Sequence, residues 1–309
     1  MSNQLGEVQA RLGTVNELAS VVTAMRGIAA ARTREALAHI PGVRACADQI
    51  GAAIADALTL ALPGAGDLPT SPRSRGVAIQ IVIGTEQGFV GTFNHRVMQA
   101  AQIAAAGDVE YFVIGDRAQR VAGEFGYPLS WSAEMVVHAN AVPDLAGRVV
   151  NALYRRLQGG NISRVTLVHG APEPQSGAAV ITTSLLPFDF QRFEPANRPY
   201  PPIVNLPARQ LLERLAEEYV YTQVCEAIVL SFAAENEARM RAMIAARRNI
   251  DDTSERLTGD YHRLRQEQIT AEIIELSTVD GASGRSAHTT VPTDQVVVTP
   301  ALSPSNRYS

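Results

Sequence analysis

The sequence predicts an α/β fold combined with a long antiparallel coiled coil formed by paired terminal helices. Apolar residues recur at spacings of three and four near both ends, short β-branched runs alternate with helical stretches in the middle, and Pro, Gly and Ser cluster between these parts. We expect a coiled-coil helix over 1–62, a Rossmann-like α/β domain over 76–200, a second coiled-coil helix over 205–279 and a disordered tail over 280–309.

The first helix is predicted by the spacing of its apolar residues, which begin with Leu5, Val8, Leu12, Val15, Leu18 and Val22. Pro41 lies inside this pattern. Because proline removes a backbone donor and clashes with the preceding turn, we expect a kink or a local break there. The helix then resumes and ends at the linker "PGAGDLPTSPRSRG".

The middle of the chain contains three β-branched runs that end in glycine, "VAIQIVIG", "VEYFVIG" and "SRVTLVHG". Helical stretches such as "VPDLAGRVVNALYRRLQGG" separate them, and this alternation predicts a mostly parallel sheet. The run "GAAVITTSLLPFDF" is expected to add one strand that returns as a hairpin.

The second terminal helix contains no proline after Pro207 as far as about residue 276. About 70 helical residues would extend roughly 105 Å, which exceeds the width of a domain of this size. Such a helix needs a partner for its apolar seam. The first helix is the other long helix in the sequence, so we expect the two to pair antiparallel.

The composition excludes several classes of protein. A net charge of −4 argues against a general polyanion binder, so nucleic acid is not an expected partner. Neither the two cysteines, Cys46 and Cys225, nor the histidines have metal-ligand spacing, so we expect no metal site and no disulfide framework. The N-terminus does not resemble a signal peptide and no apolar run reaches about 18 residues, so any membrane role should be peripheral.

The stretch "IVIGTEQGFVGTFN" runs from a predicted strand into three spaced glycines, as in a phosphate-binding loop. A phosphate loop requires G-x-G-x-x-G, or G-x-x-x-x-G-K-[ST] with its lysine. Gly84, Gly88 and Gly91 fit neither spacing, and all 27 basic residues counted as Lys+Arg are arginine. We therefore interpret the glycines as turning the strand into a loop or helix with close backbone approach. A nucleotide-binding α/β enzyme and a stand-alone coiled-coil scaffold remain the alternative functions.

Arginines gather on both predicted terminal helices. They are Arg26, Arg32 and Arg34 on the first, and Arg239, Arg241, Arg247, Arg248, Arg256, Arg263 and Arg265 on the second. A solvated helix face would explain them. The more specific hypothesis is a rod that faces acidic surfaces of a larger partner.

Four stretches, in chain order, resemble the gamma subunit of F-type ATP synthases. "TAMRGIAAAR" resembles T-x-A-M-x-x-V-A-A-x-K, and "TEQGFVGTFN" is similar to D-R-G-L-C-G-x-L-N. "ENEARMRAMIAARRN" resembles E-x-x-A-R-x-x-A-M-x-x-A-x-x-N, and "YHRLRQEQITAEIIEL" resembles Y-N-x-x-R-Q-x-x-I-T-x-E-x-x-E. The resemblance extends to about residue 282. The position of Pro41 and the longer "LSTVDGA" are departures from the family pattern, and they suggest the divergent group of alternate bacterial F-type ATPases.

The resemblance implies a non-catalytic rotor subunit that holds no cofactor or metal. The paired helices would stand inside a catalytic head of alpha and beta subunits, with an epsilon subunit and a membrane rotor ring as further partners. The chain would lie peripherally at the cytoplasmic face of the inner membrane, without inserting into it. The residues that the resemblance assigns to contact with the head are Met25, Arg26, Arg32, Arg239, Arg265, Gln266, Thr270 and Glu272.

Overall fold

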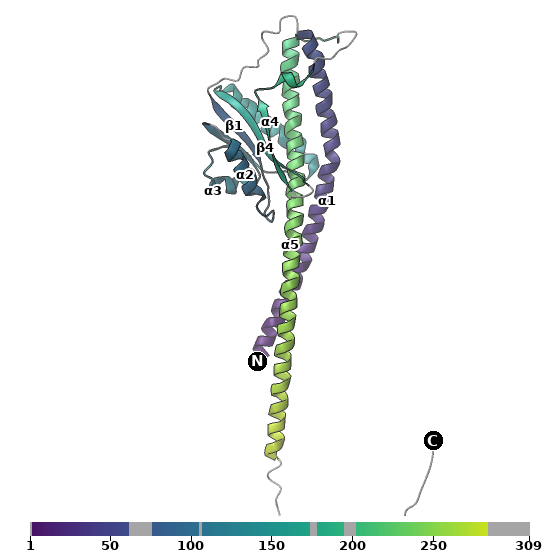
Figure 1. Ribbon diagram of the computed structural model, residues 1–309, viewed down its shortest axis with the longest axis vertical. Coiled ribbons are helices and arrows are strands. Elements are labelled where there is room, and N and C mark those ends of the chain that lie inside the picture. The colour runs from purple at the N-terminus through teal and green to yellow at the C-terminus, as the bar shows by residue number, and fades with distance from the viewer. Residues whose placement is uncertain (1, 62–75, 105–106, 174–177, 195–201, 284–309) are drawn as a thin grey trace, which may run out of the picture. The chain divides into compact units, whose positions relative to one another are not determined.

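The computed structural model of the protein describes residues 2–61, 76–104, 107–173, 178–194 and 202–283 (Figure 1). The chain divides into two compact units, one of Val15–Thr253 and one of Met1–Thr14 with Ser254–Ser309. Helix α1 (Ser2–Ala61) and helix α5 (Ala208–Ser283) each contribute to both units. Most of the predicted tail, 284–309, lies outside the described residues.

The larger unit contains a five-stranded sheet with the order β3-β2-β1-β4-β5. Its strands are β1 (Val77–Ile83), β2 (Val109–Ile114), β3 (Leu129–Ala133), β4 (Ile162–Ala171) and β5 (Ala179–Leu186). The first four strands in this order pair in parallel, whereas β5 pairs with β4 in antiparallel fashion. The predictions of a mostly parallel sheet and of a returning last strand are therefore confirmed.

Helices cover both faces of this sheet. Ile79, Ile81 and Ile83 of β1 pack in one cluster with α4 (Val142–Gln158) and α5. Val82 points to the opposite face and packs with α2 (Phe93–Ala104) and α3 (Asp116–Glu124). Since successive strand residues face opposite sides, a sheet covered twice requires apolar residues at nearly every position. This requirement explains why β1 is apolar at every position except the buried Gln80.

Two elements of this unit were not predicted from the sequence, β3 and α3. The strand β3, "LSWSA", lies at the edge of the sheet, and most of its side chains are exposed or half-buried. An edge strand of five residues has neither the apolar run nor the length that identifies a buried strand. Strand β3 is positioned instead by its parallel pairing with β2.

Within the larger unit, α1 and α5 contact each other and run in opposite directions. Thr23 of α1 accepts a hydrogen bond from Arg247 of α5 at 3.0 Å, whereas Arg44, farther along α1, bonds to Glu226, earlier in α5, at 2.8 Å. Near the end of α1, Ile54 and its apolar neighbours pack with residues of the first turns of α5. These contacts hold the two helices together at several levels of the unit.

Pro41 does not break α1, which is one continuous helix from Ser2 to Ala61. The predicted local break is therefore wrong. Proline removes only one intrahelical hydrogen bond, and buried residues anchor the helix on both sides of it. Ala36 and Ile40 precede Pro41 and Ala47 follows it, and each of these three is at most 9% exposed. Packing of the flanking turns outweighs the local preference of the proline ring.

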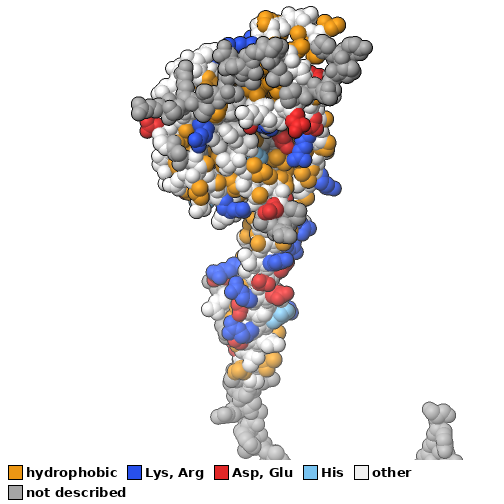
Figure 2. All heavy atoms as spheres, turned by 45° about the horizontal axis from the view of Figure 1, so that its top comes forward, with side chains coloured by type: hydrophobic (Ala, Val, Ile, Leu, Met, Phe, Trp, Pro, Cys, Tyr) orange, Lys and Arg blue, Asp and Glu red, His pale blue; other side chains and the backbone are white. Residues whose placement is uncertain are grey.

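The arginines of α5 lie among acidic residues of the same helix. Arg241 bonds to Glu237, Arg247 to Asp251 and Arg263 to Asp260. Figure 2 shows blue and red side chains interspersed along the helical segment. Much of the positive charge is thus balanced locally, as on an ordinary solvated helix face.

Candidate functional site

The loop after β1 leads from the end of that strand to α2 and contacts α5 on its way. Two glycines determine its course. A Cβ at Gly84 would lie 2.3 Å from the Cβ of Ala118 and 2.7 Å from Oδ1 of Asn94. Gly91 has a φ of +58°, which residues with a side chain rarely adopt. Close approach at Gly84 and the left-handed backbone at Gly91 confirm that these glycines turn the strand into a loop and helix.

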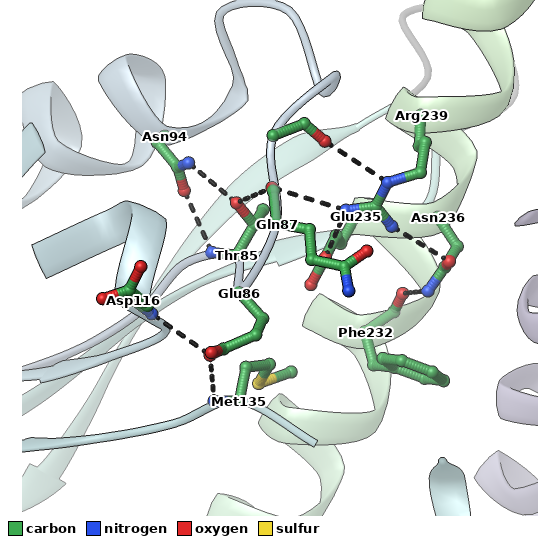
Figure 3. A network of polar contacts seen from close by, with 11 residues as sticks. Thr85, Glu86, Gln87, Asn94, Asp116, Met135, Phe232, Glu235, Asn236 and Arg239 are labelled. Atoms are coloured by element: carbon green, nitrogen blue, oxygen red, sulfur yellow. Dashed lines mark hydrogen bonds and ion pairs between the residues drawn. The ribbon is translucent and has the colours of Figure 1, made fainter. Parts of the chain in front are cut away.

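Buried hydrogen bonds tie this loop to the start of α2 (Figure 3). The backbone N–H of Thr85 donates to Oδ1 of Asn94 at 3.0 Å, and Nδ2 of Asn94 donates to Oγ1 of Thr85 at 2.8 Å. The Thr85 hydroxyl also donates to the carbonyl of Gln87 at 2.9 Å. Asn94, which the family motif contains, therefore fixes the loop internally.

The carboxylate of Glu86 lies at the start of α3. It accepts a hydrogen bond from the backbone N–H of Asp116 at 3.1 Å and another from that of Met135 at 2.8 Å (Figure 3). The next two amides of α3, those of Arg117 and Ala118, donate to the carbonyls of Glu86 and Thr85. The first N–H groups of a helix attract anions such as phosphate, but here the chain's own groups already occupy them.

A cavity of about 480 Å³ opens beside the loop, between the starts of α2 and α3. Its lining includes the carboxylates of Glu86 and Asp116 as well as the basic side chains of His95, Arg117 and Arg120. Arg120 is paired with Asp116 at 2.8 Å. Two acidic groups in the lining oppose a phosphate, so this cavity does not make a favourable nucleotide site.

A buried polar group on α5 contacts the loop after β1. Nη2 of Arg239 bonds to Oε1 of Glu235 at 2.6 Å, and Nη1 donates to Oδ1 of Asn236 at 3.2 Å. The same guanidinium donates to the carbonyls of Gln87 and Gly88, each at 3.4 Å (Figure 3). One arginine therefore connects α5 to the loop after β1.

The burial of this polar group affects the pKa of the Glu235 carboxyl group. Glu235 is 3% and Arg239 5% exposed. Burial raises the pKa of Glu235 because it disfavours the charged form, while the charge of Arg239 acts in the opposite direction. Arg32 of α1 also favours the ionised carboxylate, and Glu86 opposes it. Oε2 of Glu235 has no hydrogen-bond partner among the described residues.

The residues expected to contact a catalytic head occupy different environments. Arg239 is buried and bonded within the chain, and Arg32 is half-buried near Glu235. Met25 is half-buried and Arg26 exposed on α1. The remaining four lie on the part of α5 that belongs to the smaller unit, and all are exposed: Arg265, Gln266, Thr270 and Glu272. Head contact remains a prediction for all eight.

Sequence reasoning singled out Arg239 but missed its partners Glu235 and Asn236 and two further polar residues at this end of the sheet, Glu86 and Ser231. One signal could have identified part of this set. Ser231, Glu235 and Arg239 are spaced by four residues in a predicted helix, and such spacing places polar side chains on one face. Glu86 offers no comparable signal, because its partners lie 30 and 49 residues away.

The described residues lack two further features. They contain no group of three or more His, Cys, Asp and Glu side chains that could hold a metal ion. None of their helices is long and apolar enough to span a bilayer.

Comparison with known proteins shows that most of the chain matches one protein family. A family model described as ATP synthase matches residues 4–283. The ATP synthase gamma chain of Hyphomonas neptunium is 27% identical over 290 residues, which cover 88% of this chain and 97% of the relative. The gamma chain of Salinibacter ruber is 28% identical over 296 residues, with 88% and 96% coverage.

A solved structure agrees at the level of the fold. A chain in the Euglena gracilis mitochondrial ATP synthase, from an assembly described as OSCP/F1/c-ring, superposes with a TM-score of 0.64 at 12% identity. The match covers 96% of this chain and all of that one. The two chains therefore share a fold in which one terminal helix precedes a mixed α/β sheet in the sequence and the other follows it.

Proposed function

Because the chain belongs to the ATP synthase family, we propose that it couples ion-driven rotation of a membrane ring to ATP synthesis or hydrolysis in a catalytic head. It is a gamma chain, the central stalk subunit of an F-type ATP synthase. The observation that carries this conclusion is the family match over residues 4–283, which includes α1, the sheet and α5. The resemblance that the four motifs carry is thereby confirmed.

In the proposed stalk, the terminal helices pair as an antiparallel coiled coil. The contacts of Arg247 with Thr23 and of Arg44 with Glu226 support this pairing within the larger unit. The proposed parts are the coiled-coil helices 1–62 and 205–279, the α/β domain 76–200 and the tail 280–309. Small residues would allow close approach of the helices, and Ala29, Ala36 and Ala47 are all buried.

We propose that catalysis resides in partner subunits. The loop after β1, the best candidate for a site in this chain, is filled by the chain's own side chains: Glu86 occupies the start of α3, and Arg239 bonds to the loop carbonyls. A stalk needs such internal rigidity more than an open pocket. The proposed partners are the alpha and beta subunits, an epsilon subunit and the ring, at the cytoplasmic face of the inner membrane.

Contact with the head is proposed for Met25, Arg26 and Arg32 of α1 and for the predicted residues of α5, most of which are exposed. Arg265 and Gln266 are exposed, and among the described residues neither side chain forms an ion pair that would compete with a partner's carboxylate or carbonyl. Ile269 and Ile273, on the same part of α5, are 46% and 61% exposed. Exposed apolar side chains beside charged ones are typical of an interaction surface.

The test is reconstitution with the alpha and beta subunits of the same genome. The parent chain should assemble with them and rotate during ATP hydrolysis. Replacing both Arg265→Ala and Gln266→Ala should weaken assembly or lower the rate of ATP hydrolysis by the assembled subunits, because two polar contacts are lost. The matched control is Glu255→Ala with Arg256→Ala, an adjacent exposed pair on the same helix, which should behave like the parent. A parent chain that never joins the other subunits would contradict the stalk function.

A further inference from the structure

Three buried polar residues form a row on the face of α5 that is turned toward the strands. Ser231, Glu235 and Arg239 are spaced by four residues and are 0%, 3% and 5% exposed. Residues four apart lie on the same side of a helix, one turn above another. Row members contact the sheet end through backbone carbonyls: Oγ of Ser231 donates to the carbonyl of Ile83 at 3.1 Å, and Arg239 donates to those of Gln87 and Gly88.

Glu235 completes the row without contacting the sheet itself. Its Oε1 lies 2.6 Å from Nη2 of Arg239, the nitrogen that also donates to the carbonyl of Gln87. Asn236 accepts from the other terminal nitrogen of the same guanidinium at 3.2 Å. The carboxylate and the amide thus orient the arginine fork toward the loop, and Glu235 acts as a positioning residue for Arg239.

The apolar contacts around this row are made by large side chains of α5, such as Ile228 and Phe232, and by small ones. Ala227, Ala233 and Ala234 are all buried, and a Cβ built on Gly170 of β4 would lie 3.1 Å from the Cβ of Ala234. Apolar burial is non-directional, so these contacts resist a turn of the helix mainly through the fit of their shapes. Hydrogen bonds to carbonyls are directional and would be broken by such a turn.

A turn of α5 by one residue, about 100°, would also move Glu235 and Arg239 away from the loop. Arg239 would then lose its bonds to the carbonyls of Gln87 and Gly88. Burying charged groups without hydrogen-bond partners is strongly unfavourable. The row therefore favours one rotational setting of α5 and penalises its neighbours.

We propose that Ser231, Glu235 and Arg239 act as a key. They fix the rotational orientation of α5 relative to the carboxyl end of β1 and the loop that follows it, so that helix and sheet turn as one body. This inference rests on the proposed rotor function, in which torque passes between the α/β domain and the helices. A helix that could slip about its axis would absorb part of that torque as twist. The key prevents this through bonds to backbone carbonyls, which no side-chain substitution in the sheet removes.

The first experiment uses the complete reconstituted complex. The variant Glu235→Leu with Arg239→Met removes both charges together, because removing one would leave the other buried and unpaired. With the head stalled, the angular fluctuation of a bead on the α/β domain should widen, and fewer ions should be pumped per ATP, while assembly is retained. The matched control is Glu237→Leu with Arg241→Met, an i,i+4 pair on the same helix whose side chains are 16% and 39% exposed.

Equal widening in the control, or unchanged fluctuation in the key variant, would overturn the proposal. A second measurement, on the isolated full chain, covers the case in which the double variant does not assemble. Arg239→Lys keeps a positive charge beside Glu235 but lacks the planar fork that reaches both carbonyls. Backbone amides of residues 85–91 should then exchange hydrogen faster than in the parent, whereas Arg241→Lys should leave them unchanged.

Unchanged hydrogen exchange of residues 85–91 in Arg239→Lys would also contradict the proposal that these side chains fix the rotation of α5. The two measurements separate the key from the rotor function on which it rests. The exchange experiment needs no partner subunit, so its result stands whether or not the chain assembles. Conversely, a parent chain that fails to assemble contradicts the rotor function and leaves the exchange result intact.

Discussion

At the scale of single residues, the loop after β1 shows how differently two glycines of one motif are used. Gly84 lies against Ala118 and Asn94, with no room for a Cβ, whereas a Cβ at Gly88 would meet nothing within 4 Å. The two positions are four residues apart and look alike in the sequence. Only the fold, which brings the start of α3 against Gly84, distinguishes them.

Gly84→Ala is therefore expected to destabilise the protein, and Gly88→Ala is its matched control. The added methyl at position 84 would overlap Ala118 and displace Asn94 from its bond to Thr85. Overpacking of this kind costs about 1–3 kcal/mol. Scanning calorimetry should show a lower melting temperature for Gly84→Ala and a value near that of the parent for Gly88→Ala. Equal melting temperatures for the two variants would show that the backbone adjusts at Gly84.

Which site residues the sequence could predict depends on how local their contacts are. Arg239 and Asn94 were identified through motifs, and the spacing of the glycines predicts a loop that does not bind phosphate. Glu86 was missed because it bonds to amides that approach it only after β2, α3 and β3 are in place. Glu235 belongs to the same motif as Arg239, but its burial depends on the packing of α5 against the sheet.

At the scale of elements, a bidentate ion pair joins the sheet to the helix α4. Nη2 and Nε of Arg156, near the end of α4, bond to Oε1 and Oε2 of Glu110 on β2 at 2.7 and 2.9 Å. The side chains of both residues are less than a third exposed. This hydrogen bonding lowers the pKa of Glu110 below its ordinary value.

The pair should give the protein a pH-dependent component of stability. A depressed carboxyl pKa contributes stability that is present above the unfolded value of 4.5 and is lost as pH falls through the lower folded value. Glu110→Gln should thus be less stable than the parent at neutral pH, by roughly 0.5–1 kcal/mol. The difference should shrink below pH 4.5.

Thermal unfolding of both proteins between neutral and acid pH measures this difference. Arg156→Gln, which removes the other half of the pair, should show the same dependence on pH. A difference between parent and Glu110→Gln that stays constant down to acid pH would mean that the Glu110 carboxyl is not held by Arg156.

The elements themselves were predicted where a pattern is long and strongly periodic. Both terminal helices and the buried strands β1, β2 and β4 follow from their apolar spacing. The short edge strand β3 was missed because its position is set by pairing with β2. The break predicted at Pro41 was wrong, since a local preference of one residue competes there with packing along α1. Sequence patterns report local preference, and tertiary packing decides the rest.

At the scale of the whole molecule, the strand order identifies the position at which a sheet of this kind would bind a nucleotide. In open parallel sheets, ligands bind beyond the carboxyl ends of the strands where the order reverses, here between β1 and β4. In this chain α5 occupies that position. Ser231 bonds to the last residue of β1, and Ala234 lies against Gly170 near the end of β4.

The isolated full chain is therefore expected to bind neither ATP nor NAD. A nucleotide at the strand ends would have to displace α5, and its phosphates would have to displace the Glu86 carboxylate from the start of α3. Each displacement would leave buried polar groups without partners. Titration calorimetry should detect no binding of either nucleotide, with an established nucleotide-binding protein as the positive control. Micromolar binding that Arg117→Ala abolishes would instead assign a nucleotide to the cavity between α2 and α3, which Arg117 lines, and would revive the enzyme alternative.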